Sequence, residues 1–209
     1  AWMSDLFVIL DDVQFPQGTT WISRNRFKSH QGALWITVPV WKRGLGLQKI
    51  NEVRICHEGR WAKKHMESLH TAYKKAPYQQ ETLEFLEEMF SEKTEKVIDL
   101  HLAVIHYLMR VLGIKTKLVL LSERNVASTG TRRVVDLCTN LGASQFIAQT
   151  PAKKFLDEKS FRDTGIGITY VDPPVPIYPQ LWGNFITNLS AFDLVLNCGP
   201  KALDILVNP

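Results

Sequence analysis

The pattern of apolar and polar residues predicts a strand-rich beginning, a helical middle and an alternating end. Near the beginning, the short apolar run Leu6–Leu10 ends abruptly at Asp11 and Asp12. Such a run, partly β-branched and almost free of polar atoms, predicts a buried strand of the parallel kind. Two further strand-like runs, 21–27 and 34–38, are separated by a short glycine-containing turn, which predicts a β-hairpin.

Helical spacing of apolar residues takes over after a basic, glycine-containing loop at 41–48 and a further strand candidate at 50–55. In the first predicted helix, apolar positions recur on one face. The last one stops at a glycine, which is typical of helix ends. The three helices are expected over 61–73, 81–90 and 94–112.

Strand-like and helix-like segments alternate beyond residue 113. Strands are expected over 116–121, 145–148 and 166–171, and helices over 131–141 and 155–164. This β-α-β-α-β order predicts a parallel sheet with crossover helices. A proline-rich irregular segment at 172–179 and a closing helix at 190–196, with Ser190 as its N-cap, follow.

These elements predict an α/β fold: a mostly parallel sheet with crossover helices, an inserted β-hairpin and a helical segment. We expect a single domain over residues 1–209. Its parts are a β-rich region (1–58), a helical region (59–113), a βαβαβ region (114–172) and a C-terminal proline-rich loop with helices (173–209).

Composition narrows the classes of function. Hydrophobic residues at 45%, charged residues at 22% and a net charge of +4 are ordinary for a soluble globular protein, and tolerate anionic partners without requiring them. Basic residues are scattered among acids, so nucleic acid is not an expected partner. No apolar run reaches the ~18 residues that span a bilayer, and no signal peptide is visible.

The three cysteines are far apart in the sequence. Their spacing matches no metal site, so no metal is expected, and reduced packing residues in a cytoplasmic protein are the simpler interpretation. No pattern identifies a cofactor, and none indicates an oligomeric state.

Candidate chemistry begins at the end of the first strand, where Asp11, Asp12 and Gln14 follow the apolar run. In open α/β sheets, ligands bind just beyond the carboxyl ends of parallel strands. A strand that ends at a solvated turn is the alternative, because aspartate is common in turns.

The predicted hairpin supplies a second group of candidates. In a strand, Trp21, Ser23 and Asn25 would share one face, and Arg24 and Arg26 the other. An arginine fork suits phosphate or carboxylate. Solvated arginines on a surface hairpin are the alternative.

Three further candidates lie on or beside predicted helices. Arg133 stands at a helix start and Lys153 follows another strand, and helix starts attract anions; surface charge is the alternative. His65 lies on the apolar face of its helix. It is either a hydrogen-bonded core residue or, if it reaches a cleft, the best general base of the chain.

The last group lies near the C-terminus, where amides and hydroxyls are dense. Capping explains Ser190 and in part Asp193, which falls in the first helical turn. It does not explain Gln180, Asn184 and Asn188 together, so Gln180, Asn188 and Asp193 are candidate ligand-binding residues.

Several of these blocks together resemble the WbqC-like family. The most specific block is Asp11-Asp12-Val13-Gln14-Phe15. The others, in order, are Trp21 with Arg24-Asn25, Trp61 with Lys64-His65, Tyr73-Lys-Lys-Ala-Pro77-Tyr78, Arg133 with Leu137-Cys138, and Tyr178-Pro-Gln180 with Asn188-Leu-Ser190 and Asp193. This family is associated with gene clusters for O-antigen, lipopolysaccharide and related surface polysaccharides, and glycine transfer onto a sugar is proposed for it.

The chain departs from the family pattern at three places. It lacks a strand and a Gln-Pro turn that usually precede the segment at Asp5, so a truncated or mis-set start is expected. Gln149-Thr150-Pro151 replaces a Gly-Pro-rich turn, which disfavours anion binding through the backbone at Lys153, and Thr187 stands where proline is common.

The resemblance implies a transferase that moves a glycyl or other acyl group onto an amino sugar or nucleotide sugar. Asp11, Asp12 or His65 would be the base, and Arg24 and Arg133 would hold a phosphate. Amides of Asn25, Gln180 and Asn188 would bind hydroxyls or the developing oxyanion.

Two other functions stay open. One is a non-catalytic sugar- or nucleotide-binding partner of a biosynthetic enzyme, which would expose tryptophans for stacking. The other is a nucleotidyltransferase-like enzyme, which the missing His-x-x-His and glycine-rich phosphate turns disfavour. Convergence of the early acids, His65 and the late amides in one pocket would favour catalysis.

Overall fold

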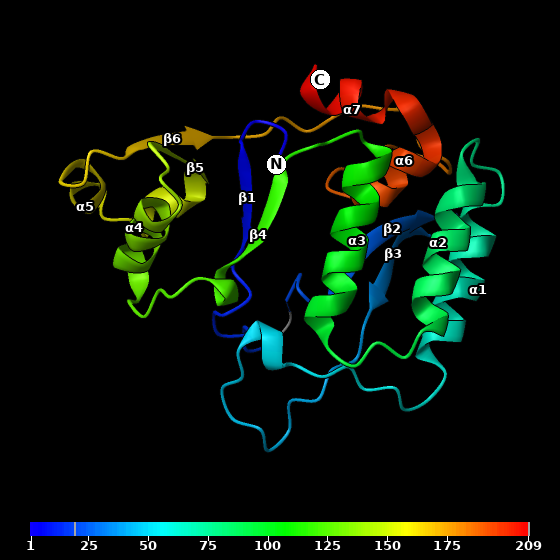
Figure 1. The fold of residues 1–209 in the computed structure, drawn as a ribbon. Helices are drawn as coiled ribbons and strands as arrows, with labels where there is room; N and C mark the ends of the chain where they lie inside the picture. The colour runs from blue at the N-terminus through cyan, green and yellow to red at the C-terminus, as the bar shows by residue number, and fades with distance from the viewer. Residues whose placement is uncertain (19, 209) are drawn as a thin grey trace. The chain divides into compact units, whose positions relative to one another are not determined.

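The computed structural model describes residues 1–18 and 20–208, which form two compact units (Figure 1). The first unit consists of Ala1–Asp12 and Thr116–Pro174, and the second of Val13–Lys115 and Val175–Pro209. Each unit is therefore built from segments that are distant in sequence. The expected single domain over 1–209 stays a prediction.

Parallel strand pairs and helices alternate in the first unit, which confirms the α/β class. β1 pairs with β4 and β5 with β6, both in parallel, and no ladder joins β4 to β5 within the described residues. The strands thus form two parallel pairs instead of one continuous sheet. The elements of this unit are β1 (Leu6–Ile9), β4 (Lys117–Leu120), α4 (Gly130–Asn140), β5 (Gln145–Gln149), α5 (Glu158–Arg162) and β6 (Gly167–Val171).

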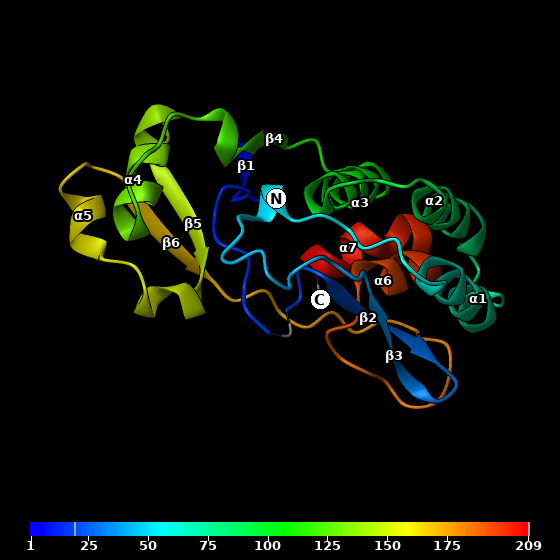
Figure 2. The same cartoon turned by 90° about the horizontal axis from the view of Figure 1, so that it is seen from below.

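The core of this unit forms where α4 and α5 pack on the β5–β6 pair (Figure 2). Val135 and Phe161 are fully buried there, and the rings of Phe146 and Phe161 stack with centroids 5.5 Å apart. α5 is shorter than the helix predicted over 155–164, and a 3-10 turn at Thr150–Lys154 precedes it. The helix begins after Asp157, whose carboxylate accepts a hydrogen bond from the Lys159 amide.

The second unit joins an antiparallel hairpin to a set of helices, as the sequence pattern predicts. β2 pairs with β3 in the register Arg24↔Thr37 to Ser29↔Gly32. The elements are β2 (Arg24–Ser29), β3 (Gly32–Thr37), α1 (Trp61–Tyr73), α2 (Gln79–Ser91), α3 (Val97–Val111), α6 (Ala191–Cys198) and α7 (Ala202–Val207). Ser190 caps α6 by accepting a hydrogen bond from the Phe192 amide, as expected.

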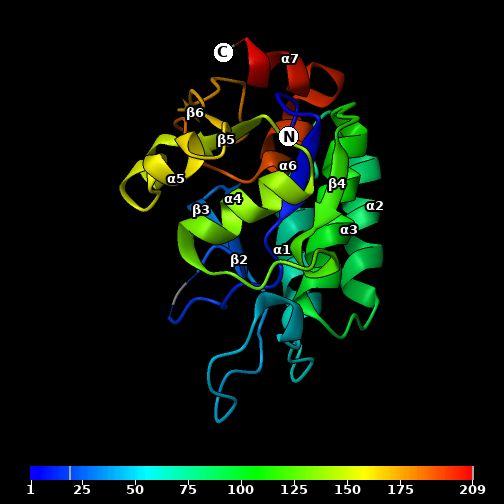
Figure 3. The ribbon, with the colours of Figure 1, turned by 60° about the vertical axis from the view of Figure 1, so that its left-hand side comes forward.

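The predicted strand at 50–55 is wrong. Ile50–Glu52 form a 3-10 helix, η1, and the following residues make only isolated bridges. The backbone amides of Ile50 and Ile55 bond to two different segments, at the carbonyls of Val13 and Glu95. Among residues 1–18 and 20–208, no single strand is therefore present to form a ladder with this segment. Residues 41–49, between β3 and η1, form a loop that extends beyond the helices and strands of this unit (Figure 3).

Aromatic side chains hold the hairpin to the helices. Phe27 of β2 stacks on Phe192 of α6 with centroids 6.0 Å apart, and Phe85 stacks on Tyr107 at 3.9 Å. The contact of Phe192 thereby ties the second segment of this unit to the first. All three cysteines are free thiols, and burial raises the thiol pKa of Cys138 and Cys198.

Within the described residues, none of the helices has the length and apolar character needed to cross a membrane. The same residues contain no group of three or more histidine, cysteine, aspartate or glutamate side chains placed to hold a metal ion.

Candidate functional site

The residues singled out from the sequence are divided between the two units. Asp11, Asp12, Arg133 and Lys153 belong to the first. The second holds Gln14, Trp21, Arg24, Asn25, His65, Gln180, Asn188 and Asp193. The convergence of the early acids with His65 and the late amides stays a prediction, and each unit contains its own cluster of polar side chains.

In the first unit, two strand ends and a helix start build what we call the strand-end cluster: Asp11, Asp12, Ser122 and Arg133. Because β1 and β4 are parallel, their carboxyl ends lie side by side. Asp11 is 1% exposed and accepts two hydrogen bonds from Ser122, from the amide at 2.9 Å and from Oγ at 2.5 Å. This carboxylate therefore joins the ends of the two strands.

Asp12 is held from the other side by Arg133, in the first turn of α4. Arg133 Nη2 lies 2.9 Å from Asp12 Oδ2, and Nη1 donates to the Asp12 carbonyl at 3.1 Å. Both side chains are 20% exposed. The guanidinium fork is thus already engaged, and a phosphate at this place would have to compete with the carboxylate of Asp12.

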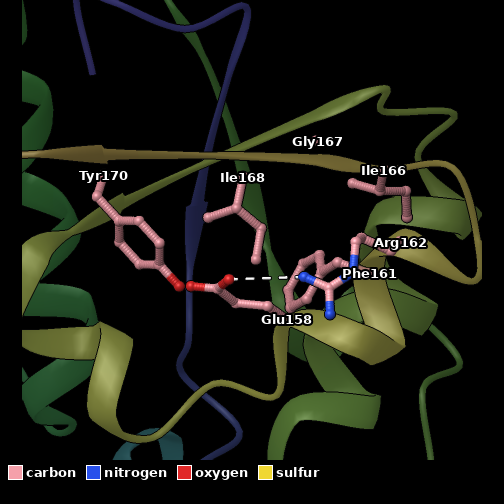
Figure 4. A pocket seen from close by; sticks show the side chains of 7 residues that line it. All are labelled: Glu158, Phe161, Arg162, Ile166, Gly167, Ile168 and Tyr170. Carbon is pink, nitrogen blue, oxygen red and sulfur yellow. Dashed lines mark ion pairs between the residues drawn. The ribbon is translucent and has the colours of Figure 1, made fainter.

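Lys153 lies beside a shallow hollow in the same unit. Its Nζ is 4.0 Å from Glu158 Oε1 and 5.5 Å from the centroid of the Tyr170 ring. Figure 4 shows the hollow between α5 and β6, with Glu158 lying between Tyr170 and Arg162. Its volume is about 210 Å³, and its lining residues are Glu158, Phe161, Arg162, Ile166, Gly167, Ile168 and Tyr170. None of the acids of the strand-end cluster lines it.

In the second unit, the hairpin carries a face of indoles and guanidinium groups, which we call the indole–arginine face: Trp21, Arg24, Arg26 and Trp35. Arg26 is opposite Trp35 in the ladder. The two indoles lie 5.3 Å apart, and they are 60% and 38% exposed. The guanidinium carbon of Arg24 lies 4.0 Å from the Trp35 ring centroid, in cation–π contact.

The position of Trp21 differs from the prediction. Trp21 was expected opposite the arginines, but β2 begins only at Arg24, so strand alternation does not govern the preceding turn. Its ring instead packs on Trp35, on the arginine side. Asn25 is exposed, and its Oδ1 accepts a hydrogen bond from the Arg26 amide at 2.8 Å.

Three cationic side chains, those of Arg24, Arg26 and Lys28, lie at every second position along this side of β2. The rest of the fold covers each of them to a different extent. Lys28 is 2% exposed. Arg26 Nη2 donates to the carbonyls of Thr187 and Asn188 at 3.0 and 2.9 Å. Arg24 makes no hydrogen bond or ion pair within the described residues, where its Nε is also buried without a partner. Arg24 therefore presents the guanidinium that is free to bind an external anion.

Lys28, the buried cation of β2, is the hydrogen-bond partner of part of the amide-rich segment near the C-terminus. Lys28 Nζ donates to Gln180 Oε1 at 3.0 Å and to the Asn184 carbonyl at 2.7 Å. Gln180 also bonds to both backbone groups of Ile186. Asn188 adopts a left-handed conformation, with φ 55°, and is exposed. Gln180 thus holds the fold, while the Asn188 side chain is open to solvent.

Asp193 lies at the centre of a buried network that also stabilises the fold. It is 0% exposed, and its oxygens accept hydrogen bonds from Tyr73 at 2.5 Å and Tyr178 at 2.9 Å. Burial raises its pKa, although these hydrogen bonds and the charge of Lys28 act in the opposite direction. Burial and the nearby carboxylate raise the pKa of both tyrosines. A role for Asp193 in ligand binding stays a prediction.

His65 is attached to the end of the hairpin that carries Arg24. Its Nε2 lies 2.8 Å from the carbonyl of Thr37, the ladder partner of Arg24. The Thr37 amide lies farther from the same Nε2, at 3.3 Å, so we assign the proton to Nε2, because its shorter contact is to a carbonyl, which can only accept. Nδ1 then carries the lone pair and has no hydrogen-bond partner within the described residues. Gln14, by contrast, is exposed in an isolated bridge with Lys49.

Sequence reasoning missed Trp35, Lys28, Tyr73 and Ser122 as parts of these clusters. The alternation Arg24-x-Arg26-x-Lys28 could have indicated a row of cations on one strand face. The others depend on pairings between distant segments, which leave no local signal.

Comparisons with known proteins agree on one family. A model described as the WbqC-like protein family matches residues 2–205. The chain is 34% identical over 204 residues to "Uncharacterized protein Rv1507c" of Mycobacterium tuberculosis (strain ATCC 25618 / H37Rv), covering 97% of this chain and 87% of that protein. No solved structure matches the chain.

Proposed function

Because the chain belongs to the WbqC-like protein family, we propose that it is a transferase that moves a glycyl or other acyl group onto an amino sugar or nucleotide sugar. The proposed setting is the cytoplasmic assembly of O-antigen or a related surface polysaccharide. The observation that supports it most is the indole–arginine face, with two exposed indoles beside the open guanidinium of Arg24.

The chemistry of this face suits a sugar phosphate. Indole rings offer flat apolar surfaces on which a sugar ring or base can stack. An arginine fork binds phosphate oxygens through paired, charge-assisted hydrogen bonds. Arg24 lies within reach of both kinds of contact, since its guanidinium already rests on Trp35. The exposed amide of Asn188 can bind a sugar hydroxyl beside Arg26.

The proposed reaction needs a group that accepts a proton. The amine nitrogen of the sugar attacks the carbonyl carbon of an activated acyl donor, an ester or thioester, and an N–C bond forms. The bond to the leaving group breaks, and the proton of the amine passes to the base. The free Nδ1 of His65, at the Arg24 end of the hairpin, suits this role.

Asp11 and Asp12 are proposed as further members of the machinery. Their place at the carboxyl ends of parallel strands supports this assignment, as does the family resemblance. In this role Asp11 is a positioning residue, because Ser122 occupies both of its oxygens, and Asp12 is the more accessible carboxylate.

The binding step is tested by calorimetry with nucleoside diphosphate amino sugars. Replacing Arg24 with alanine should weaken binding at least about tenfold, because a charge-assisted hydrogen bond is lost. Trp35→Ala should weaken it similarly. Arg54→Ala and Trp41→Ala are matched controls, since Arg54 is exposed and paired with Glu95, and Trp41 is exposed elsewhere. Equal losses in test and control variants, or no binding by the parent, would contradict the proposal.

A second candidate is a non-catalytic sugar- or nucleotide-binding partner of a biosynthetic enzyme, which the exposed indoles also favour. His65→Gln separates the two. In a transferase this variant keeps sugar binding and loses transfer of labelled glycine or acyl group, whereas in a binding partner the parent transfers nothing. Mass spectrometry of sugar intermediates in a deletion strain identifies the missing group.

A further inference from the structure

The loop between β3 and η1 exposes three large apolar side chains. Trp41 is 43%, Leu45 53% and Leu47 68% exposed. Figures 1 and 3 show the loop projecting away from the rest of its unit, at the bottom of both views. Such a group of exposed apolar side chains on a projecting segment is typical of an interaction surface.

The base of the loop is held by hydrogen bonds. The Trp41 amide donates to the Arg54 carbonyl at 2.9 Å, and Gln48 Nε2 donates to the Trp41 carbonyl at 2.9 Å. The Phe15 amide in turn donates to the Gln48 carbonyl at 2.8 Å. These bonds hold the two ends of the loop together at one place, which we call the neck, and the tip lies beyond it.

The tip itself is a tight turn. The Leu45 amide donates to the Lys42 carbonyl at 3.3 Å. Gly44 and Gly46, on either side of Leu45, have φ values of 78° and 63°, which residues with a side chain rarely adopt. Both leucines of this turn are exposed.

The charge of the loop is of one sign. Lys42 and Arg43 are exposed, and residues 41–49 contain no aspartate or glutamate. Lys42 Nζ also reaches the Gly18 carbonyl at 3.1 Å, which keeps this cation near the neck. The loop thus combines apolar side chains at its tip with the cations Lys42 and Arg43 just before it.

We propose that this loop docks the protein on the surface of an anionic lipid bilayer. Leu45 and Leu47 enter the boundary between headgroups and acyl chains, and the indole of Trp41 lies at the headgroup level. The cations bind the lipid phosphates, where each basic residue adds to the attraction. The positive charge of the loop complements an anionic bilayer surface, and the exposed leucines reach the apolar layer beneath the headgroups. This inference does not depend on the proposed transferase activity.

Sedimentation of the full chain with vesicles tests the proposal. Vesicles of phosphatidylcholine mixed with phosphatidylglycerol should bind the protein, and vesicles of phosphatidylcholine alone should bind it much more weakly. The double variant Leu45→Ser, Leu47→Ser should bind anionic vesicles at least about tenfold more weakly. The reason is that the free energy of moving two leucine side chains from water into the bilayer is lost. Arg43→Gln should bind them about fivefold more weakly.

Matched variants separate this loop from a general surface effect. Val175→Ser with Ile177→Ser removes two exposed apolar side chains elsewhere, and Lys63→Gln removes one exposed charge. Both should bind vesicles like the parent. The proposal is overturned if the parent does not sediment with anionic vesicles, if the leucine variant binds as well as the parent, or if the control variants lose as much binding. Sugar binding by calorimetry is expected to be unchanged in the leucine variant.

Discussion

The hydroxyl of Tyr73 donates a 2.5 Å hydrogen bond to Oδ2 of Asp193, and so joins α1 to α6 inside the second unit. The same hydroxyl accepts a hydrogen bond from the Lys28 amide of β2 at 2.8 Å. A single oxygen atom therefore connects the hairpin that carries the indole–arginine face to two helices. The second oxygen of this carboxylate, Oδ1, accepts a hydrogen bond from the Tyr178 hydroxyl.

Removing that hydroxyl should destabilise the second unit. We expect Tyr73→Phe to lower the free energy of unfolding by about 2–4 kcal/mol, because a buried amide and a buried carboxylate oxygen both lose a partner. Chemical denaturation measures the change. Tyr78→Phe is the control, since Tyr78 is exposed and should lose less than about 0.5 kcal/mol. Similar losses in the two variants would show that the hydrogen bonds of the Tyr73 hydroxyl add little to the free energy of unfolding.

Stability should depend on pH through Asp193. Burial raises its pKa above the ordinary value of 3.8, so the folded protein holds this proton more tightly than the unfolded chain. The contribution is complete below about pH 3.8 and is lost as pH rises through the raised pKa. Asp193→Asn cannot titrate. The free energy of unfolding of the parent minus that of this variant should therefore decrease with rising pH, and an increase would contradict the raised pKa.

Two adjacent arginines of α4 should differ in their effect on stability. Arg133→Ala removes the ion pair with Asp12, in which both side chains are 20% exposed, and should cost about 1–3 kcal/mol. Arg132→Ala removes an exposed pair with Asp136 and should cost no more than about 0.5 kcal/mol. Thermal unfolding compares the variants, and hydrogen exchange in α4 locates the loss. Equal costs would mean that the Asp12–Arg133 pair contributes no more than a surface pair.

The hydrophobic pattern predicted most elements because their signals are local. Three helices follow from apolar spacing within the segments 61–73, 81–90 and 94–112, and the hairpin from two strand-like runs around a glycine turn. The interpretation of 50–55 failed because β-branched and apolar residues there bury their side chains without pairing along one strand. The strand pairing within the first unit could not be predicted from local patterns either, since hydrogen bonds join β1 to β4 across more than a hundred residues.

The candidate residues were predicted by type, whereas their partners were not. Asp12 was selected as a candidate base and Arg133 as a phosphate-binding group, and the structure pairs them with each other. Gln180 was selected because capping could not explain it, and its partner is the buried Lys28, which carried no signal of burial. A polar residue in a sequence shows what it can bind, but the donor or acceptor that reaches it comes from another segment.

The chain by itself determined its elements, its α/β class and its family, because propensity, spacing and short motifs act over a few residues. Long-range packing decided which groups are satisfied inside the fold and which face solvent. Along β2 the three cations Arg24, Arg26 and Lys28 are chemically alike, yet the segment 180–188 covers two of them and leaves Arg24 open. That difference arises only when the C-terminal segment packs against the hairpin, where burial and hydrogen bonding replace water.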